Sequence, residues 1–289
     1  MKKKIIVIGA GQFGRAAVSL LPDTHCQLLA LSDNSEKLQG TVFRHPLYGE
    51  IPVLSVTEAV GLEPDAFLIG VIDDERSGQL TEQLRGLGFQ GEILGLGSLA
   101  HMIDVRGATL LRLAERVHSL KVSGSVAELG VYRGDFAWKL NALFPDRKLY
   151  LFDTFEGFDC RDVQVETDLG LSRAGEGDFR DTGVRVVRER LPYPEQAVFV
   201  PGYFPETAAP YMEEQYAFVS LDADLYAPIL EGLTYFVPRM SPGGMILLHD
   251  YNNKRFRGAK KAVEDYEAMH GPLHLVPLCD LHGSAVITL

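Results

Sequence analysis

Cysteine is scarce in this sequence, and its spacing is typical of no structural site. The 289 residues include three cysteines, Cys26, Cys160 and Cys279. They lie far apart and form no CxxC pair, which excludes both the paired pattern of a disulfide framework and the spacing of a zinc site. We therefore expect a reduced, cytoplasmic protein.

Basic residues are also fewer than acidic ones. The chain has 28 Lys and Arg against 39 Asp and Glu, a formal net charge of -11 at pH 7. Affinity for a phosphate backbone comes from clustered Lys and Arg that release counterions. The sequence therefore argues against a nucleic-acid partner.

Long hydrophobic runs are absent as well, because no run approaches the roughly 20 apolar residues needed to cross a bilayer. The stretch MKKKIIVIGAG begins like a signal peptide, but its apolar run breaks at glycines and no cleavage-like site follows. We expect no membrane partner. The 46% hydrophobic and 23% charged residues are enough for two buried cores, so we expect two domains.

Residues 1–98 predict a small Rossmann-like α/β domain. A β-branched run, the segment GAGQFGRAAVSLL and a second strand CQLLALSDN form a βαβ unit. Its glycines match GxGxxG, and Asp33 lies where an acidic residue could bind a ribose hydroxyl. They indicate either a dinucleotide site or only a βα turn. A loop-rich stretch with one short strand at 51–54 follows, and the second half of a dehydrogenase domain is missing, which favours the turn.

The pieces VIGAGQFGR, LSDN and GEIPVLS resemble the N-terminal domain of bacterial sugar acyltransferases. The resemblance implies at most a contact with a sugar nucleotide, or a docking role. Residues 99–121 carry apolar side chains at helical spacing and predict a connecting helix before a second domain at 122–289.

The second domain shows seven strand candidates. They are residues 125–129, 148–153, 197–200, 217–222, 245–249, 273–278 and 284–289. The first five alternate with crossover segments, whereas CDLHG, between the last two, is too short for a parallel crossover. We therefore predict a mostly parallel seven-stranded sheet with a reversed last strand, which resembles class I S-adenosylmethionine (SAM) methyltransferases.

Ligands of such a sheet bind beyond the carboxyl ends of its strands. The first strand ends in VAELGVYRG, with Glu128 followed by Gly130 and Gly134, which let the backbone approach a ligand closely. The second ends at Asp153, the position of a carboxylate that accepts two ribose hydroxyls. Together these residues predict a SAM site.

Acidic residues also end the fourth and fifth strands. SLDADLY and LLHDY place Asp222, Asp224, His249 and Asp250 at one sheet edge, where a shared divalent cation would relieve carboxylate repulsion. Mg2+ there would bind adjacent substrate oxygens and orient the hydroxyl to be methylated. Alternatively, the acids cap helices and bind substrate without a metal.

Six motifs in order resemble the macrocin O-methyltransferase family over about residues 120–289. They are ELGVYRGD, LFDTFEGF, DFRDT, VPGYFPET, SLDADLYAPILEGLTYFVPRMSPGGMILLHDY and GAKKAVEDY. The resemblance implies SAM- and Mg2+-dependent methylation of a sugar hydroxyl. Around SAM it implies Glu128, Gly130, Tyr132, Asp153, Thr154 and Phe155, with Asp181, Gly202 and Tyr203 near the adenine. It implies Asp222 and Asp250 as metal ligands.

His249 departs from the acidic pair that precedes the tyrosine in metal-dependent family members. Mg2+ prefers oxygen, so a histidine there lowers affinity, favours another divalent metal, or acts as general base. No histidine occurs between residues 121 and 248, so the base is His249, a carboxylate or metal-bound hydroxide. The acidic segment 158–179, which shows no period, is either a lid over the substrate or a surface loop. Tyr203, Phe204 and Tyr211 either stack on a ligand or pack.

The sequence thus predicts a SAM-dependent O-methyltransferase acting on a small sugar, sugar nucleotide or glycoside. Two alternatives remain: a nicotinamide-dependent oxidoreductase using the glycine loop at residue 9, and a noncatalytic sensor or scaffold that binds SAM. The acceptor is not specified, and a homo-oligomer is left open.

Overall fold

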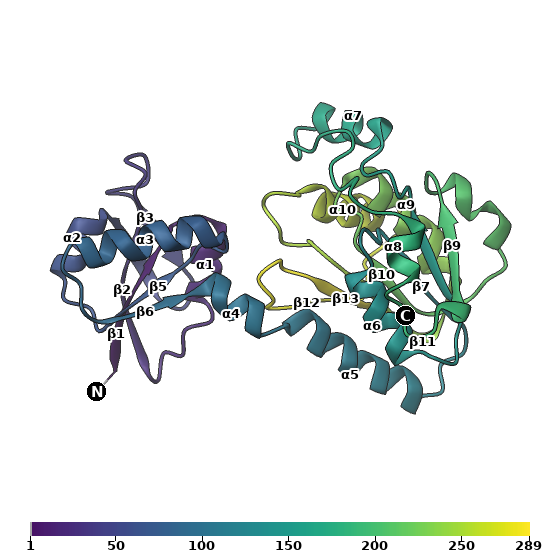
Figure 1. Ribbon diagram of the computed structural model, residues 1–289, viewed down its shortest axis with the longest axis horizontal. Helices are drawn as coiled ribbons and strands as arrows, with labels where there is room; N and C mark the ends of the chain where they lie inside the picture. The colour runs from purple at the N-terminus through teal and green to yellow at the C-terminus, as the bar shows by residue number, and fades with distance from the viewer. Residues whose placement is uncertain (1) are drawn as a thin grey trace. The chain divides into compact units, whose positions relative to one another are not determined.

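The structure is a computed structural model that describes residues 2–289, apart from the side chains of Ala100 and His101. The chain divides into two compact units, residues 1–104 and 105–289. Each has its own sheet, shown in Figure 1. Within the described residues, no helix is both long and apolar enough to span a membrane.

The first unit is a six-stranded sheet in the order β3-β4-β2-β1-β5-β6. Its elements are β1 (Lys3–Ile8), α1 (Gln12–Val18), β2 (Cys26–Ser32), β3 (Val42–His45), β4 (Gly49–Leu54), α2 (Val56–Gly61), β5 (Ala66–Ile69), α3 (Asp74–Gly86), β6 (Glu92–Gly95) and α4 (Leu96–Met102). Strand β3 pairs antiparallel with β4, so the stretch predicted to hold one short strand forms a hairpin instead.

The glycine turn of this unit is explained by packing. A Cβ on Gly14 would lie 1.7 Å from the carbonyl oxygen of Gly9, and one on Gly70 would lie 2.4 Å from the Cα of Gly14. Asp33 accepts a hydrogen bond of 2.7 Å from the N–H of Ala10 and another from Ser35, so its carboxylate stabilises this turn. The glycines therefore let α1 lie against the strand ends, as the turn interpretation requires.

The second unit confirms the predicted α/β fold. Its sheet has the order β12-β13-β11-β10-β7-β8-β9. The strands are β7 (Ser125–Leu129), β8 (Leu149–Asp153), β9 (Ala197–Pro201), β10 (Tyr216–Leu221), β11 (Met240–Leu248), β12 (Leu275–Pro277) and β13 (Ala285–Thr288). The five from β7 to β11 run parallel, and β13 pairs antiparallel with β11.

Helices cover both faces of this sheet, as the nearly continuous burial of its central strands requires. They are α5 (Val105–Ser119), α6 (Asp135–Leu143), α7 (Cys160–Asp168), α8 (Val184–Arg188), α9 (Tyr226–Phe236) and α10 (Gly258–His270). Val126 of β7 packs with α5 and α6, whereas the next residue, Ala127, packs with α9 and α10. Every residue of β10 is buried, so polar side chains are confined to the strand ends.

One expectation about helices was wrong, and one helix was not predicted. The predicted connecting helix over 99–121 is two helices, α4 and α5, and α5 is part of the second unit because Leu110, Ala114 and Val117 lie in its core. The segment 158–179 contains the nine-residue helix α7, although it shows no period. The Asp159 side chain caps that helix by accepting the N–H of Arg161.

Candidate functional site

Strained backbone marks the carboxyl edge of the second sheet. Four residues that are not glycine have positive φ just beyond four neighbouring strands: Tyr132 after β7, Phe155 after β8, Asp224 after β10 and Asp250 after β11. Their φ angles lie between 48° and 58°. Such conformations cost energy and gather at functional sites. These four residues therefore lie at the same edge of the sheet as the strand-end residues predicted to form a site.

Asp222, His249 and Asp250 meet at the ends of β10 and β11. His249 Nδ1 lies 2.8 Å from Asp222 Oδ1 and 3.3 Å from Asp250 Oδ1. Asp250 is buried, with 3% of its surface exposed, and its Oδ1 accepts a hydrogen bond of 2.8 Å from Asn253. Asp224 offers a further carboxylate within 4.8 Å of Asp222 and His249. The four strand-end residues predicted to share one edge therefore form one cluster.

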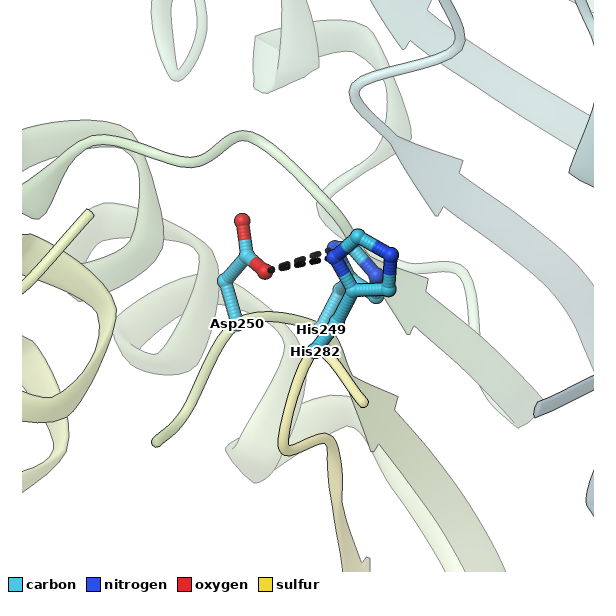
Figure 2. Close-up of side chains that lie close together, drawn as sticks. All are labelled: His249, Asp250 and His282. Atoms are coloured by element: carbon cyan, nitrogen blue, oxygen red, sulfur yellow. Dashed lines mark ion pairs between the residues drawn. The ribbon is translucent and has the colours of Figure 1, made fainter. Parts of the chain in front are cut away.

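His282 completes this cluster from the loop before β13. Figure 2 shows the His249 and His282 rings facing the Asp250 carboxylate together. The two ring centroids are 5.1 Å apart, and His282 Nδ1 lies 3.9 Å from Asp250 Oδ1. The sequence analysis missed His282, although the predicted reversed strand contained the signal. Because β13 runs antiparallel to β11, the loop that precedes it reaches the edge where β11 ends.

Arg106, on α5, is the second residue that the sequence analysis missed. Its Nη1 lies 2.8 Å from Asp222 Oδ2, its Nη2 donates to Ser220 at 3.2 Å, and its guanidinium lies 3.8 Å from the centroid of the Phe136 ring. Asp222 therefore faces Arg106 with one oxygen and His249 with the other. No motif near Arg106 indicates this role.

The cluster has strongly shifted pKa values. Burial would raise the pKa of Asp222, but Arg106 and His249 outweigh it and lower the pKa below the ordinary range. Burial would lower the pKa of His249, but the Asp222 charge, together with the close approach of the Asp222 and Asp250 oxygens to Nδ1, raises it to about 10. Burial, then a hydrogen bond to Asp250, raises the pKa of Asp224. The cluster is thus charge-balanced, with His249 protonated when no cation is bound.

The geometry fits a divalent cation. His249 Nδ1 is buried and, among the described residues, has no hydrogen-bond partner of acceptable geometry, although carboxylate oxygens lie within 3.3 Å. Two overlapping groups each have their donor atoms within 4.8 Å of one another, which is close enough to hold an ion: Asp222 and Asp224 with His249, and Asp250 and His282 with His249. The carboxylates of Asp222 and Asp250 suit Mg2+, whereas the imidazoles of His249 and His282 suit a transition metal.

Glu128 lies at the end of β7, beside this cluster. It is 1% exposed, and its Oε2 has no hydrogen-bond partner among the described residues. Burial, and then the charge of Asp222, raises the pKa of Glu128 well above the ordinary range. An unpaired buried carboxyl oxygen is costly unless a ligand satisfies it. Glu128 is therefore placed to bind a polar or cationic ligand group.

Asp153, at the end of β8, orders the glycine loop that follows β7. Its Oδ2 accepts hydrogen bonds from the N–H groups of Val131, at 2.6 Å, and Tyr132, at 2.9 Å, and its Oδ1 accepts one from Phe155. A carboxylate has about four acceptor sites, so the three bonds leave room for one from a ligand. Gly130 has φ of 85°, and a Cβ there would lie 2.2 Å from the main-chain oxygen of Asp222. The absence of a side chain at Gly130 thus lets the loop pack directly against the main chain of Asp222 in the acidic cluster.

Tyr132 and Asp181 lie together near this loop. The Tyr132 hydroxyl donates to Asp181 Oδ1 at 2.7 Å, and its ring packs edge-on against Phe179, with centroids 5.2 Å apart. Gly134 begins α6 with φ of 80°, and a Cβ there would lie 2.8 Å from Val187. Tyr132 and Asp181, both predicted to lie around SAM, are thus neighbours.

The Gly202–Tyr203 turn contacts α7. Gly202 donates to the main-chain oxygen of Asp153. The Tyr203 hydroxyl donates to Asp162 Oδ1 at 2.8 Å, and Arg161 lies 3.5 Å from the centroid of the Tyr203 ring. Arg161 thus covers one ring face. Phe204 is buried in the core and Tyr211 packs against that core, which supports packing for both.

Segment 158–179 is tied at its two ends. The N–H of Phe158 donates to Asp178, and that of Gly177 donates back to Phe158, both at 3.0 Å. Thr154 closes the turn before it by donating to the main-chain oxygen of Gly157. The segment is therefore a closed loop carrying α7, and it stands above the strand ends in Figure 1.

A doubly covered, mostly parallel seven-stranded sheet with a reversed last strand defines the class I methyltransferase fold. The chain belongs to the macrocin-O-methyltransferase (TylF) family, whose model matches residues 97–285. It is 29% identical over 162 residues to the mycinamicin III 3''-O-methyltransferase of Micromonospora griseorubida, covering 52% of this chain and 63% of that one. The chain thus spans less than two thirds of that relative.

A second relative is the 8-demethyl-8-(2,3-dimethoxy-alpha-L-rhamnosyl)-tetracenomycin-C 4'-O-methyltransferase of Streptomyces olivaceus. It is 29% identical over 202 residues, which cover 65% of this chain and 75% of that enzyme. Among solved structures, the O-methyltransferase NovP superposes with a TM-score of 0.52 at 23% identity, covering 63% of this chain and 78% of that one. This likeness supports the fold.

Proposed function

We propose that this protein transfers the methyl group of SAM to a hydroxyl of a sugar-type acceptor, assisted by a divalent cation. Family membership supports the transfer. Both relatives are named as O-methyltransferases, and one name specifies a rhamnosyl group, which supports a sugar hydroxyl as the acceptor.

The cluster of Asp222, His249 and Asp250 carries the proposal. It lies beyond the carboxyl ends of β10 and β11, and its buried imidazole nitrogen faces carboxylate oxygens without a hydrogen bond of acceptable geometry within the described residues. A cation held there would lower the pKa of the acceptor hydroxyl and fix its oxygen. The raised pKa of His249 argues against a general base, because a protonated imidazole accepts no proton, and a cation bound at Nδ1 would displace that proton.

The residues at the ends of β7 and β8 hold SAM in this proposal. Gly130 allows the backbone to approach the cofactor, Asp153 orders the loop and offers its remaining acceptor site to a ribose hydroxyl, and Glu128 offers its unpaired oxygen to the ammonium group. The neighbouring Tyr132, Thr154, Phe155, Asp181, Gly202 and Tyr203 shape the nucleoside end of the site. Since methyl transfer needs little acid–base work, orientation of the hydroxyl toward the sulfonium supplies most of the rate.

Calorimetry with SAM, with NAD in parallel, tests the cofactor. We expect the intact protein to bind SAM and to give no response to NAD. Binding of NAD without SAM would instead favour an oxidoreductase that uses the glycine loop of the first unit.

Titration with Mn2+ as a spectroscopic probe tests the cation site. We expect Asp222→Asn with Asp250→Asn to abolish Mn2+ binding and leave SAM affinity within about twofold. Glu189→Gln, which alters an exposed carboxylate, is the matched control. Unchanged Mn2+ binding in the double variant would show that the acids act without a metal at this edge.

A further inference from the structure

A cavity of about 660 Å³ lies between the end of segment 158–179 and the chain before α10. One wall is residues 170–174 with Asp178, and the other is residues 254–257. Figure 1 shows the helices that flank these walls, α7 and α10, on the same side of the second unit. Its volume is within the range of small-molecule sites, about 300–1,000 Å³.

Cationic side chains dominate the lining. Arg173, Lys254, Arg255 and Arg257 line the cavity against one carboxylate, Asp178. This is unexpected in a chain with 39 acidic and 28 basic residues. Asp178 accepts a hydrogen bond from the N–H of Gly175, so its charge is partly engaged within its own loop.

The three arginines form no ion pair with any residue that the structure describes. Arg257 donates instead to the main-chain oxygens of Gly170 and Leu171, and so joins the two walls. Arg255 lies 5.0 Å from the centroid of the Phe256 ring. Arg173 is exposed on the opposite wall. The charge of Arg257 also acts on the buried Glu166 carboxyl, so the charges of Arg173 and Arg255 are the ones left for a ligand, and guanidinium groups match phosphate oxygens well.

The cavity also lies near the proposed reaction centre. Lys254 follows Asp250 by four positions in the chain, which limits the distance between their Cα atoms to about 14 Å. Within that segment, Asn253 donates to the Asp250 carboxylate and accepts the N–H of Arg255, so one side chain connects the cluster to the cavity wall. A sugar with its reactive hydroxyl at Asp250 would extend its substituents toward the cationic side chains.

We propose that the cavity binds the phosphate or diphosphate group of the acceptor, so that the substrate is a phosphorylated sugar rather than a neutral glycoside. This inference rests on the proposed function and deepens it. The acidic cluster takes the hydroxyl end of the substrate, and the cationic cavity takes its anionic end. The opposite charges of the two regions thereby fix which way round the sugar lies.

Calorimetry with inorganic pyrophosphate and with UDP tests the inference. EDTA in every titration ensures that no divalent cation carries the anion. We expect both probes to bind the wild type, and Arg173→Ala with Arg255→Ala to weaken them at least tenfold while SAM affinity stays within twofold. The control, Arg112→Ala, removes an exposed arginine paired with Glu115 on α5 and should leave all three affinities unchanged.

The outcomes separate the inference from the proposed function. If SAM binds but neither anion does, the phosphate site is wrong and methyl transfer stands. If the double variant loses SAM and the anions equally, the cavity belongs to the cofactor and the inference is also overturned. If the wild type binds no SAM, the proposed function fails at its first step.

Methylation assays distinguish the sources of the phosphate. A hexose, its 1-phosphate and its UDP derivative are compared as acceptors, with KM measured for wild type and double variant. We expect the double variant to raise KM only for phosphorylated acceptors. Equal KM changes for the free hexose would contradict a phosphate site.

Discussion

Arg106 and Asp222 form a largely buried ion pair, with Arg106 Nη1 2.8 Å from Asp222 Oδ2, although 115 residues lie between them in sequence. Their side chains are 14% and 22% exposed. The pair joins α5 to the end of β10 and offsets part of the negative charge in the acidic cluster. It therefore stabilises the fold at the point where the proposed cation binds.

Replacement of Arg106 by Met should lower the free energy of unfolding by about 2 to 4 kcal/mol, because it removes the cationic partner of Asp222 Oδ2, a largely buried oxygen, and leaves only the contact of Oδ1 with His249. Arg106→Lys should recover part of this loss, since Lys keeps the charge but lacks the planar fork that reaches Ser220 and stacks on Phe136. Urea unfolding measures both.

Arg112→Met is the matched control for this substitution. Arg112 lies on the same helix in an ion pair whose side chains are 76% and 55% exposed, so its loss should cost less than about 1 kcal/mol. Equal losses in Arg106→Met and Arg112→Met would contradict a stabilising role for the Arg106 pair.

Asp153→Asn should weaken SAM binding by at least tenfold. The amide has one acceptor oxygen in place of two, so it cannot keep all three main-chain hydrogen bonds that order the loop at 131–132 and the turn at 155. Calorimetry measures the affinity, and circular dichroism confirms the fold.

Asp33→Asn offers a control of the same chemistry in the first unit. Asp33 also accepts main-chain N–H groups at a glycine turn, from Ala10 and Ser35. Its substitution should leave SAM affinity unchanged. A comparable loss in Asp33→Asn would mean that the cofactor involves the first unit.

Gly130→Ala should destabilise the protein by at least about 3 kcal/mol. The new Cβ would lie 2.2 Å from the main-chain oxygen of Asp222, and φ of 85° is unfavourable for alanine. Gly170→Ala isolates the second effect, because Gly170 has φ of 62° but no atom within 4 Å of the new Cβ, and it should cost about 1 to 2 kcal/mol. Thermal unfolding of both variants measures the difference, and equal losses would rule out close packing at Gly130.

The strand-end residues could be predicted from the sequence because parallel strands bring their carboxyl ends to one edge. Glu128, Asp153, Asp222 and Asp250 each follow a run of buried residues, so their common edge follows from the order of runs. His282 could have been found in the same way, from the reversed strand. Arg106 could not have been found in this way. Helical periodicity shows which face of a helix is buried, but not which residue a polar side chain at the edge of that face contacts.

The errors in the fold have similar causes. Strand β3 has only four residues, in which exposed positions alternate with more buried ones. Such a short alternation in the sequence does not distinguish a strand from a loop. Helix α7 carries polar residues on most of its surface, so it shows no apolar stripe. Its stability depends on the Asp159 cap and on buried contacts of Asp162 and Glu166, which only the folded chain reveals.

Asp162 predicts a pH dependence of stability. Burial, the largest effect, raises the pKa of its carboxyl to about 6 from the model-compound value of 3.8, although the Tyr203 hydroxyl opposes the shift. Between pH 4 and 6 the folded chain therefore keeps a proton that the unfolded chain has released. The contribution of Asp162 to stability is largest below pH 4 and falls as the pH rises to 6.

Asp162→Asn should remove this dependence, because the amide does not ionise and can still accept the Tyr203 hydroxyl. Relative to wild type, the variant should gain about 1 to 2 kcal/mol between pH 4.5 and 7.5, measured by urea unfolding at both values. Asp159→Asn is the control, because the pKa of Asp159 is shifted in the opposite direction: hydrogen bonding to Arg161 lowers it to about 2. The difference in stability between Asp159→Asn and wild type should therefore stay constant from pH 4.5 to 7.5. If Asp162→Asn also gives a constant difference, Asp162 is ionised in the folded chain over this range, and the Tyr203 hydroxyl donates to a carboxylate rather than to a neutral carboxyl group.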